Sequence, residues 1–141
     1  MSTERTLLLL KPDAVARNLR GEIIRRIETK GFSILALGQR TATASELSRH
    51  YAEHEGKPFY PALVSYMASG PLVALVVEGT EVIATMRTLM GATNPAEALP
   101  GTIRGDLARL WDLPVIHNLV HGSDSVESAE REIAIWFPEL S

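Results

Sequence analysis

The sequence predicts one domain in which helices pack on a small sheet, of the α/β or α+β class. Short apolar runs of strand length occur at residues 5–10 (RTLLLL), 32–38 (FSILALG) and 72–78 (LVALVVE). Segments with apolar residues at helical spacing separate these runs. No internal repeat, low-complexity tract or linker interrupts the 141 residues, so we expect a single domain over 1–141.

The chain is expected to open with a strand, a helix and a second strand. The segment 21–31 carries Ile23, Ile24 and Ile27 at helical spacing and ends in a glycine, which stops a helix. Because this segment lies between the first two apolar runs, the order predicts a βαβ opening. The pattern alone does not choose between a parallel and an antiparallel sheet.

Further helices are expected on either side of the third strand. Thr43 and Glu46 have the spacing of a capping box, which predicts a helix through His54. A second helix is predicted over 61–69, before a Gly-Pro pair. The remaining expected elements are a helix over 80–90 closed by Gly91, a loop rich in Pro and Gly to Ile103, a strand at 118–120 and a final helix.

Composition disfavours several classes of protein. No apolar run approaches the ~20 residues that span a bilayer. The absence of cysteine excludes disulfides, thiol catalysis and thiolate metal ligands. A net charge of −3 argues against a broad nucleic-acid-binding face. The opening residues, MSTERTLLLLKPD, have too short an apolar stretch for a secretory signal, so we expect a cytoplasmic protein.

Common phosphate and metal motifs are missing. The only Gly-Lys pair is followed by Pro58, so there is no phosphate-binding G-x-x-x-x-G-K-[ST] loop, and no G-x-G-x-x-G occurs. His50 and His54 lie four residues apart on an expected helix, a spacing that can hold zinc. No third ligand is suggested nearby, and a solvated helix face is the competing interpretation. We therefore predict no dedicated protein metal site.

The stretch NLVHGSD, residues 118–124, places His121 at the start of the last predicted helix. Ser123 and Asp124 can cap that helix, whose unpaired N–H groups favour an anion. Glu132 follows in the same helix and could orient the His121 ring or the serine. From the pattern alone, a structural hydrogen-bonding histidine and a catalytic one both remain open.

From residue 4 to about 137 the chain resembles nucleoside diphosphate kinases, which pass a terminal phosphate from a nucleoside triphosphate to a nucleoside diphosphate. NxxHGSD is similar to that family's signature around its phosphohistidine. The other matching blocks, in order, are ERTLLLLKPDAV, HYAEHEGKPFYPALVSYMASGP and MGATNPAEALPGTIRGD. The resemblance implies an α+β fold: a ferredoxin-like βαββαβ core with an antiparallel sheet and additional helices.

The resemblance also implies a ping-pong reaction, in which His121 takes the γ-phosphate on Nδ1 and then gives it to a second nucleotide. It assigns phosphate binding to Lys11, Tyr51, Arg87, Thr93 and Arg104, with Mg²⁺ on the phosphate oxygens and few or no direct protein ligands. It assigns the base to Phe59, Leu63 and Val115, the ribose to Asn118, and the support of the His121 ring to Ser123 and Glu132. Stacking tolerates any base, so we expect broad nucleotide acceptance. We also expect the Arg104 guanidinium to face phosphate and to contribute little to core burial.

The chain departs from the family pattern between Arg104 and Asn118, which are fourteen residues apart here, four more than the pattern has. We place the added turn at 111–114, because Asp and Pro favour turns that bulge outward. Trp111 favours a subunit boundary for this turn. Leu113 or Ile116 could then replace Val115 as the base contact.

The resemblance implies nucleoside di- and triphosphates as partners, and a homo-oligomer built from dimers, with a hexamer favoured over a tetramer. Two rival functions are a non-catalytic nucleotide-binding or regulatory module and a nucleic-acid binder. Loss of His121, Lys11 or Arg104 would favour them, and all three residues are present. The sequence also lacks a basic stripe with interleaved aromatic residues.

Overall fold

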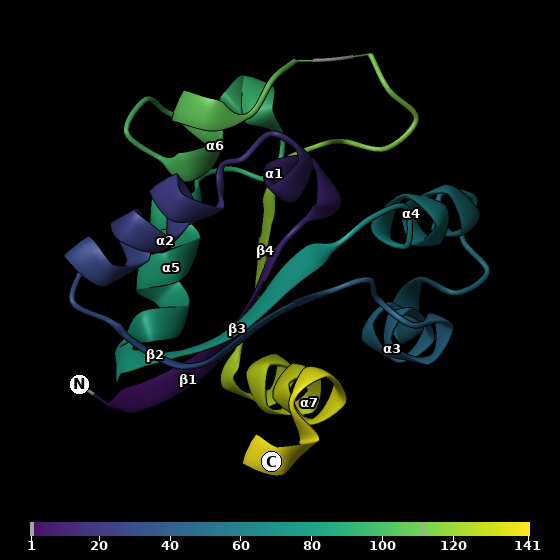
Figure 1. Ribbon diagram of the computed structural model, residues 1–141. Helices are drawn as coiled ribbons and strands as arrows, with labels where there is room; N and C mark the ends of the chain where they lie inside the picture. Colours follow the sequence, from purple (N-terminus) through teal and green to yellow (C-terminus); the bar gives the residue numbers. More distant parts are fainter. Residues whose placement is uncertain (1, 111) are drawn as a thin grey trace.

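The computed structural model describes residues 2–110 and 112–141, so the expectation placed on Trp111 lies outside the described residues. Within them, four strands form one sheet in the order β2-β3-β1-β4 (Figure 1). Every neighbouring pair is antiparallel. The strands are β1 (Thr3–Leu10), β2 (Ser33–Arg40), β3 (Leu72–Thr80) and β4 (Val120–Gly122).

The four consecutive leucines of β1 supply both faces of the sheet, because successive side chains of a strand point to opposite sides. Leu8 and Leu10 join one buried cluster, and Leu7 and Leu9 join the other. All four are at most 2% exposed. A continuous apolar run therefore marks a strand that is covered on both faces.

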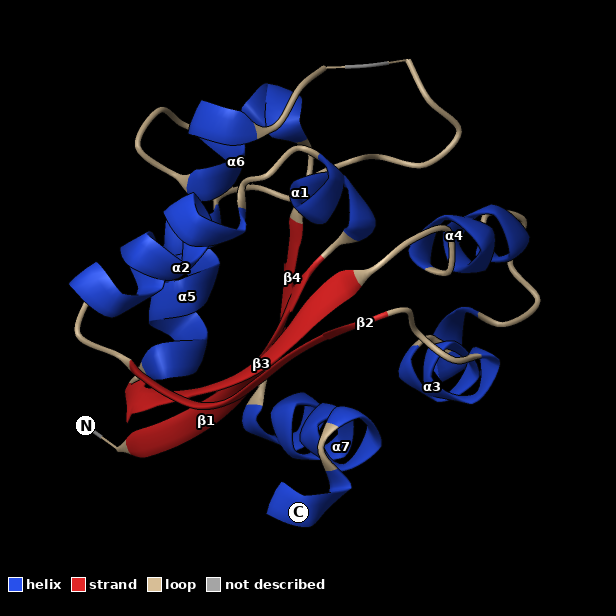
Figure 2. Cartoon of the chain, in the orientation of Figure 1, coloured by secondary structure: helices blue, strands red, loops and turns tan. Residues whose placement is uncertain are grey.

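Helices cover the two faces (Figure 2). The first cluster is closed mainly by α2 (Arg20–Thr29) and α5 (Val82–Met90), through residues such as Ile27 and Met86. The second is closed by α3 (Ala44–His50), α4 (Tyr60–Met67) and α7 (Val126–Trp136). Shorter elements are α1 (Pro12–Ala16), α6 (Ile103–Leu107) and the 3-10 turns η1 (Ala52–His54), η2 (Pro95–Glu97) and η3 (Pro138–Leu140).

This arrangement is an α+β, ferredoxin-like βαββαβ core with additional helices, as the family resemblance implied. The βαβ opening is a split one, because β3 lies between β1 and β2 and pairs with both. The predicted capping box is confirmed: Thr43 Oγ1 accepts from Glu46 N–H at 3.1 Å, and the Glu46 carboxylate accepts from Thr43 N–H at 3.0 Å.

Two predicted element boundaries were wrong for reasons that the structure shows, and two short helices, α1 and α6, were missed. The helix expected to reach His54 ends at His50, and η1 follows as a separate turn. The last strand starts at Val120 rather than two residues earlier, because Leu119 has φ 72°, a left-handed conformation that a strand does not contain. Both missed helices are only five residues long, and α1 begins with Pro12, which Lys11 alone separates from β1.

No helix within residues 2–110 and 112–141 combines the length and the apolarity needed to cross a bilayer.

Candidate active site

His121 is presented by the short strand β4, where it pairs in register with Leu9 of β1. The next residue, Gly122, packs tightly on the core, since a Cβ atom there would lie 2.7 Å from Met90 Cε and 3.1 Å from Leu8 Cδ2 and would require the Met90 side chain to shift. Close packing of β4 on the core therefore fixes the backbone that carries the histidine. The ring itself is partly exposed, with 21% of the side-chain surface accessible.

Glu132 of α7 holds one side of the His121 ring. Its Oε1 atom lies 2.8 Å from His121 Nε2 and also accepts a hydrogen bond from Ser123 Oγ at 2.8 Å. The serine is buried, and its Oγ accepts the N–H of Leu7 at 3.1 Å, which anchors it to β1. A carboxylate only accepts hydrogen bonds, so His121 carries its proton on Nε2 and keeps the lone pair on Nδ1.

His50 packs against the other side of this ring, with centroids 4.6 Å apart in an edge-on arrangement. It is 4% exposed, and the indole N–H of Trp136 donates to its Nδ1 at 3.0 Å. Burial, followed by the nearby His121, lowers the pKa of His50 to about 2. His50 is therefore neutral near pH 7 and carries its proton on Nε2.

His50, His121 and Glu132 each bring one potential metal-ligand atom within 4.8 Å of the others, the only such group of three among the described residues. His54, the partner considered from sequence spacing, is not one of them. The Nε2 and Oε1 atoms of His121 and Glu132 already bond each other, and His50 Nδ1 accepts the indole N–H. We interpret the group as a hydrogen-bonded support for His121.

A polar pocket of about 290 Å³ opens in front of His121. Five of the predicted site residues line it: Tyr51, Arg87, Thr93, His121 and Glu132. Arg87 extends from α5 and contacts the Gly122 carbonyl at 3.4 Å. Burial, with a smaller contribution from Glu132, raises the pKa of Tyr51 far above neutral pH, so its hydroxyl remains a hydrogen-bond donor.

Other residues of this pocket were missed from the sequence as possible site residues. Asp124 was considered only as a helix cap, and His54 only as a zinc ligand. Arg131 lies on α7, where a charged residue looks like part of a solvated helix face. The signal that could have found it is its position one residue before Glu132. The additional lining residues are His50, Glu53, His54, Gly122, Asp124, Ser128 and Arg131.

Lys11, Asn118 and Thr93 form a connected edge beside the pocket. Lys11 Nζ donates to Asn118 Oδ1 at 2.9 Å, and Asn118 Nδ2 donates to the Thr93 carbonyl at 2.9 Å. Burial, followed by the positive charge of Arg104, lowers the pKa of Lys11 to about 8. The predicted ribose residue and two predicted phosphate residues are thus brought together.

Arg104 is more deeply built into the fold than we expected. It is 6% exposed, and its guanidinium donates to three backbone carbonyls: Asn118 at 3.2 Å, Gly91 at 2.9 Å and Val120 at 2.6 Å. Burial, followed by the charge of Arg87, lowers its pKa to about 10. The expectation that this side chain contributes little to burial was wrong, because it joins three segments that the sequence pattern leaves separate.

The three predicted base contacts do not line the His121 pocket. Phe59 caps the start of α4 and is 48% exposed, with the His54 ring edge-on to it at 5.3 Å. Leu63 lies one turn further along α4, partly buried against the second cluster. Val115 is half-buried in the lengthened loop. Only Phe59 offers an exposed aromatic face.

The lengthened loop lies at the surface in its described part. Asp112, Leu113 and Pro114 are exposed, and none of the described residues of 108–117 lines the His121 pocket. Asn118 keeps its bonds to Lys11 and Thr93 at the end of the loop. The expectation that the added residues lie at the surface is confirmed for residues 112–114.

Known proteins are similar to this chain over nearly its whole length. A family model described as nucleoside diphosphate kinase matches residues 4–141. The nucleoside diphosphate kinase of Rhodococcus jostii (strain RHA1) is 61% identical over 140 residues, covering 99% of this chain and 98% of that protein. That of Mycobacterium tuberculosis (strain ATCC 25618 / H37Rv) is 60% identical over 137 residues, covering 96% and 98%.

A solved structure shows the same similarity in three dimensions. It is a halophilic nucleoside diphosphate kinase from Halobacterium salinarum in complex with CDP, with a TM-score of 0.90 and 45% sequence identity. The match covers 96% of this chain and 88% of that one. With a family model over nearly the full length and relatives at about 60% identity, the chain belongs to the nucleoside diphosphate kinase family of enzymes.

Proposed function

We propose that residues 1–141 act as one domain that moves the γ-phosphate of a nucleoside triphosphate to a nucleoside diphosphate through a phosphohistidine at His121. The observation that carries this proposal is the 2.8 Å bond between His121 Nε2 and Glu132 Oε1. It occupies Nε2 and leaves the Nδ1 lone pair as the nucleophile of a ring that faces a polar pocket.

In the first half-reaction, His121 Nδ1 attacks the γ-phosphorus. A nitrogen–phosphorus bond forms, and the bond to the bridging oxygen breaks, so the diphosphate leaves with the electron pair. The ring gains positive character, which the adjacent Glu132 carboxylate stabilises while the proton stays on Nε2. In the second half-reaction a terminal phosphate oxygen of another diphosphate attacks the same phosphorus, and His121 leaves with its lone pair restored.

Phosphoryl transfer depends mainly on in-line positioning and on stabilising charge on the phosphate oxygens. We assign this task to Lys11, Tyr51, Arg87, Thr93 and Arg104. A guanidinium has five N–H donors, and Arg104 uses three on backbone carbonyls, which leaves two for phosphate. Arg87 and the hydroxyls of Tyr51 and Thr93 line the pocket directly.

For the nucleoside, we propose that the base stacks on the exposed face of Phe59 and packs against Leu63 and Val115. Asn118, which Lys11 and Thr93 hold in place, would bond the ribose hydroxyls. Stacking and apolar contact do not depend on base identity, so several nucleotides should react. The CDP bound to the Halobacterium relative supports a nucleoside diphosphate as a ligand of this class of protein.

We propose that Mg²⁺ arrives with the nucleotide. Glu53 and Asp124 fit such an ion, because carboxylate oxygens on the pocket wall are the ligands that Mg²⁺ prefers. A hydrogen bond from Ser128 lowers the pKa of Asp124 and keeps it ionised. These two residues would hold the ion mainly through water. When bound, Mg²⁺ neutralises charge on the phosphate oxygens.

We also propose a homo-oligomer built from dimers, with a hexamer favoured over a tetramer, in the cytoplasm. Among the described residues β2 pairs with β3 alone, so its other edge is open. Leu35 and Leu37 on this strand are 44% and 50% exposed. Pairing of two β2 edges would bury these leucines and satisfy the open backbone groups. The cytoplasmic location is supported by the cysteine-free composition.

The decisive experiment mixes the protein with ATP, Mg²⁺ and GDP and measures GTP and ADP. We expect both products, together with an acid-labile, base-stable phosphate on His121 after ATP alone. His121→Ala should abolish the label, and a variant that labels at the normal level would place the nucleophile elsewhere. No GTP at protein concentrations where nucleotide binding is demonstrated would leave a binding module.

A further inference from the structure

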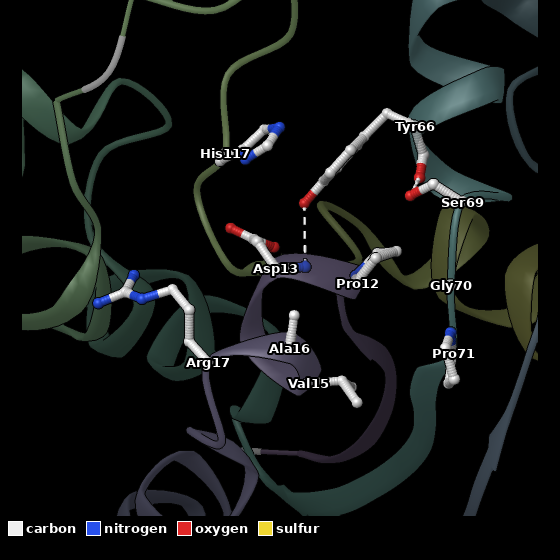
Figure 3. Close-up of a pocket in the computed structure, with 10 residues that line it drawn as sticks. All are labelled: Pro12, Asp13, Val15, Ala16, Arg17, Tyr66, Ser69, Gly70, Pro71 and His117. Atoms are coloured by element: carbon white, nitrogen blue, oxygen red, sulfur yellow. Dashed lines mark hydrogen bonds between the residues drawn. The ribbon is translucent and has the colours of Figure 1, made fainter.

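A second pocket, of about 400 Å³, lies between α1, α4 and the end of the lengthened loop (Figure 3). Asp13, Tyr66 and His117 lie along it, from these three elements respectively. None of the three lines the pocket in front of His121. Asp13 contacts Leu119, and Tyr66 contacts His117, which are the two residues on either side of Asn118.

The residue after Asn118 is held from α1. Leu119 has φ 72°, a left-handed conformation that a leucine seldom adopts. Its N–H donates to Asp13 Oδ2 at 3.1 Å, and its carbonyl accepts the N–H of Lys11 at 2.8 Å. Lys11 and Asp13, at the start of α1, therefore fix both backbone polar groups of Leu119.

The residue before Asn118 is held from α4. The His117 ring stacks on the Tyr66 ring, with centroids 4.3 Å apart and planes 20° from parallel. The Tyr66 hydroxyl accepts the N–H of Asp13 at 3.2 Å, the dashed line in Figure 3. Asp13 and Tyr66 are thus bonded to each other, and each holds one neighbour of Asn118.

The stack attaches the end of a loop whose described apolar side chains are largely exposed. The described residues of 108–119 contain no helix or strand, and Leu110, Leu113 and Ile116 are 71%, 39% and 51% exposed. A loop that packs so little of its own apolar surface depends on contacts at its ends, and the stack adds to the hydrogen bonds of Asn118 and Leu119. The stack is made one residue before the point where the loop must deliver Asn118.

We propose that His117 and Tyr66 are a positioning pair. Their stack fixes the end of the lengthened loop, so that Asn118 and its partner Lys11 are already arranged to bind a nucleotide. Neither residue touches the reacting atoms. This inference rests on the proposed function, because Asn118 matters only as a nucleotide-binding residue.

The test compares His117→Ala, which removes the stacking ring, with His117→Phe, which keeps an aromatic ring. Calorimetric titration with ADP measures Kd directly, and steady-state kinetics measure KM and kcat. We expect His117→Ala to weaken ADP binding and raise KM roughly threefold to tenfold with kcat nearly unchanged, since a smaller fraction of loops holds Asn118 in place. Amides 117–119 should exchange hydrogen faster.

His117→Phe should restore Kd and KM to near the wild-type values. Unchanged ADP affinity in His117→Ala would overturn the proposal. So would equal losses in Ala and Phe that follow a fall in melting temperature, because a merely structural ring would behave in this way. ADP binding does not require phosphate transfer, so wild-type protein that binds ADP but forms no GTP would contradict the proposed function and leave the positioning pair standing.

Discussion

The Nε2 atom of His121 lies 2.8 Å from Oε1 of Glu132, which comes from a helix on the far side of the turn that follows β4. The carboxylate is 5% exposed and is also bonded by Ser123. A buried carboxylate with two donors cannot turn away without leaving a polar group unpaired, so the ring is held in one orientation.

Glu132→Gln should therefore slow phosphate transfer. The amide has nearly the same shape and can still bond, but it removes the negative charge that stabilises the ring as the phosphohistidine forms. We expect kcat/KM to fall by up to about a hundredfold, with a modest change in melting temperature. Rapid-quench measurement of phosphohistidine formation checks this.

The matched control for that variant is Glu130→Gln on the same helix. Glu130 has a half-exposed side chain that pairs with Arg5 at 2.5 Å, and it does not line the His121 pocket. Its effect on kcat/KM should lie within experimental error. Equal effects of the two variants would show that Glu132 acts only through the helix charge.

Arg104→Ala should reduce both stability and turnover. The substitution leaves three carbonyls, of Asn118, Gly91 and Val120, without the guanidinium. We expect a loss of about 3 kcal/mol in the free energy of unfolding, measured by urea denaturation, besides lower kcat/KM. Arg25→Ala is the control, since its solvent-exposed pair with Glu22 should contribute little to stability. Full stability with lost activity would restore the purely phosphate-facing interpretation.

The sequence predicted most of the fold because its signals are local. The leucines of β1, the isoleucines of α2 and the Thr43–Glu46 capping box each specify an element through near neighbours in the chain. The start of β4 could not be predicted, because the left-handed Leu119 depends on Asp13, more than a hundred residues away in sequence. The antiparallel order likewise came from the family resemblance and not from the pattern.

His121, Ser123 and Asn118 could be assigned to one candidate site from the sequence, because they belong to one motif. The roles of His50 and Arg104 were missed because both depend on contacts between distant segments. His50 faces His121 only because Trp136 and the core of the second cluster hold it there. Arg104 reaches three carbonyls that come together only in the folded chain.

His50 should make the fold sensitive to mild acid. Its pKa is about 2 when folded, against 6.5 as the ordinary value, so the folded state keeps it neutral. Above pH 6.5 the ring is mostly neutral in the unfolded chain as well, so protonation of His50 costs the fold little stability. As the pH falls below 6.5, His50 binds a proton in the unfolded chain but not in the folded chain. The free energy of unfolding therefore decreases down to pH ~2. Between pH 7 and pH 5 this loss is about 2 kcal/mol.

Urea denaturation at pH 7 and pH 5 measures that loss. His50→Gln has no titratable ring but offers a carbonyl oxygen to the Trp136 indole, so the variant should lose less stability between the two pH values than the wild type does. The difference between the two proteins removes the contributions of the other histidines. The same pH dependence in both proteins would contradict a buried neutral His50.

Lys11 should make nucleotide binding sensitive to mild alkali. Its pKa is lowered from 10.5 to about 8, mainly by burial and then by Arg104, so the ammonium loses its proton as the pH rises through about 8. A neutral amine no longer attracts phosphate, and we expect ADP affinity to fall between pH 7 and pH 9.

Calorimetric titration across this range measures the effect, and Lys11→Met supplies the control. This variant should bind ADP more weakly at pH 7 and should lose most of the dependence on pH, because the titrating group is gone. If Lys11→Met shows the wild-type dependence, another group titrates, and the lowered pKa of Lys11 has no part in binding.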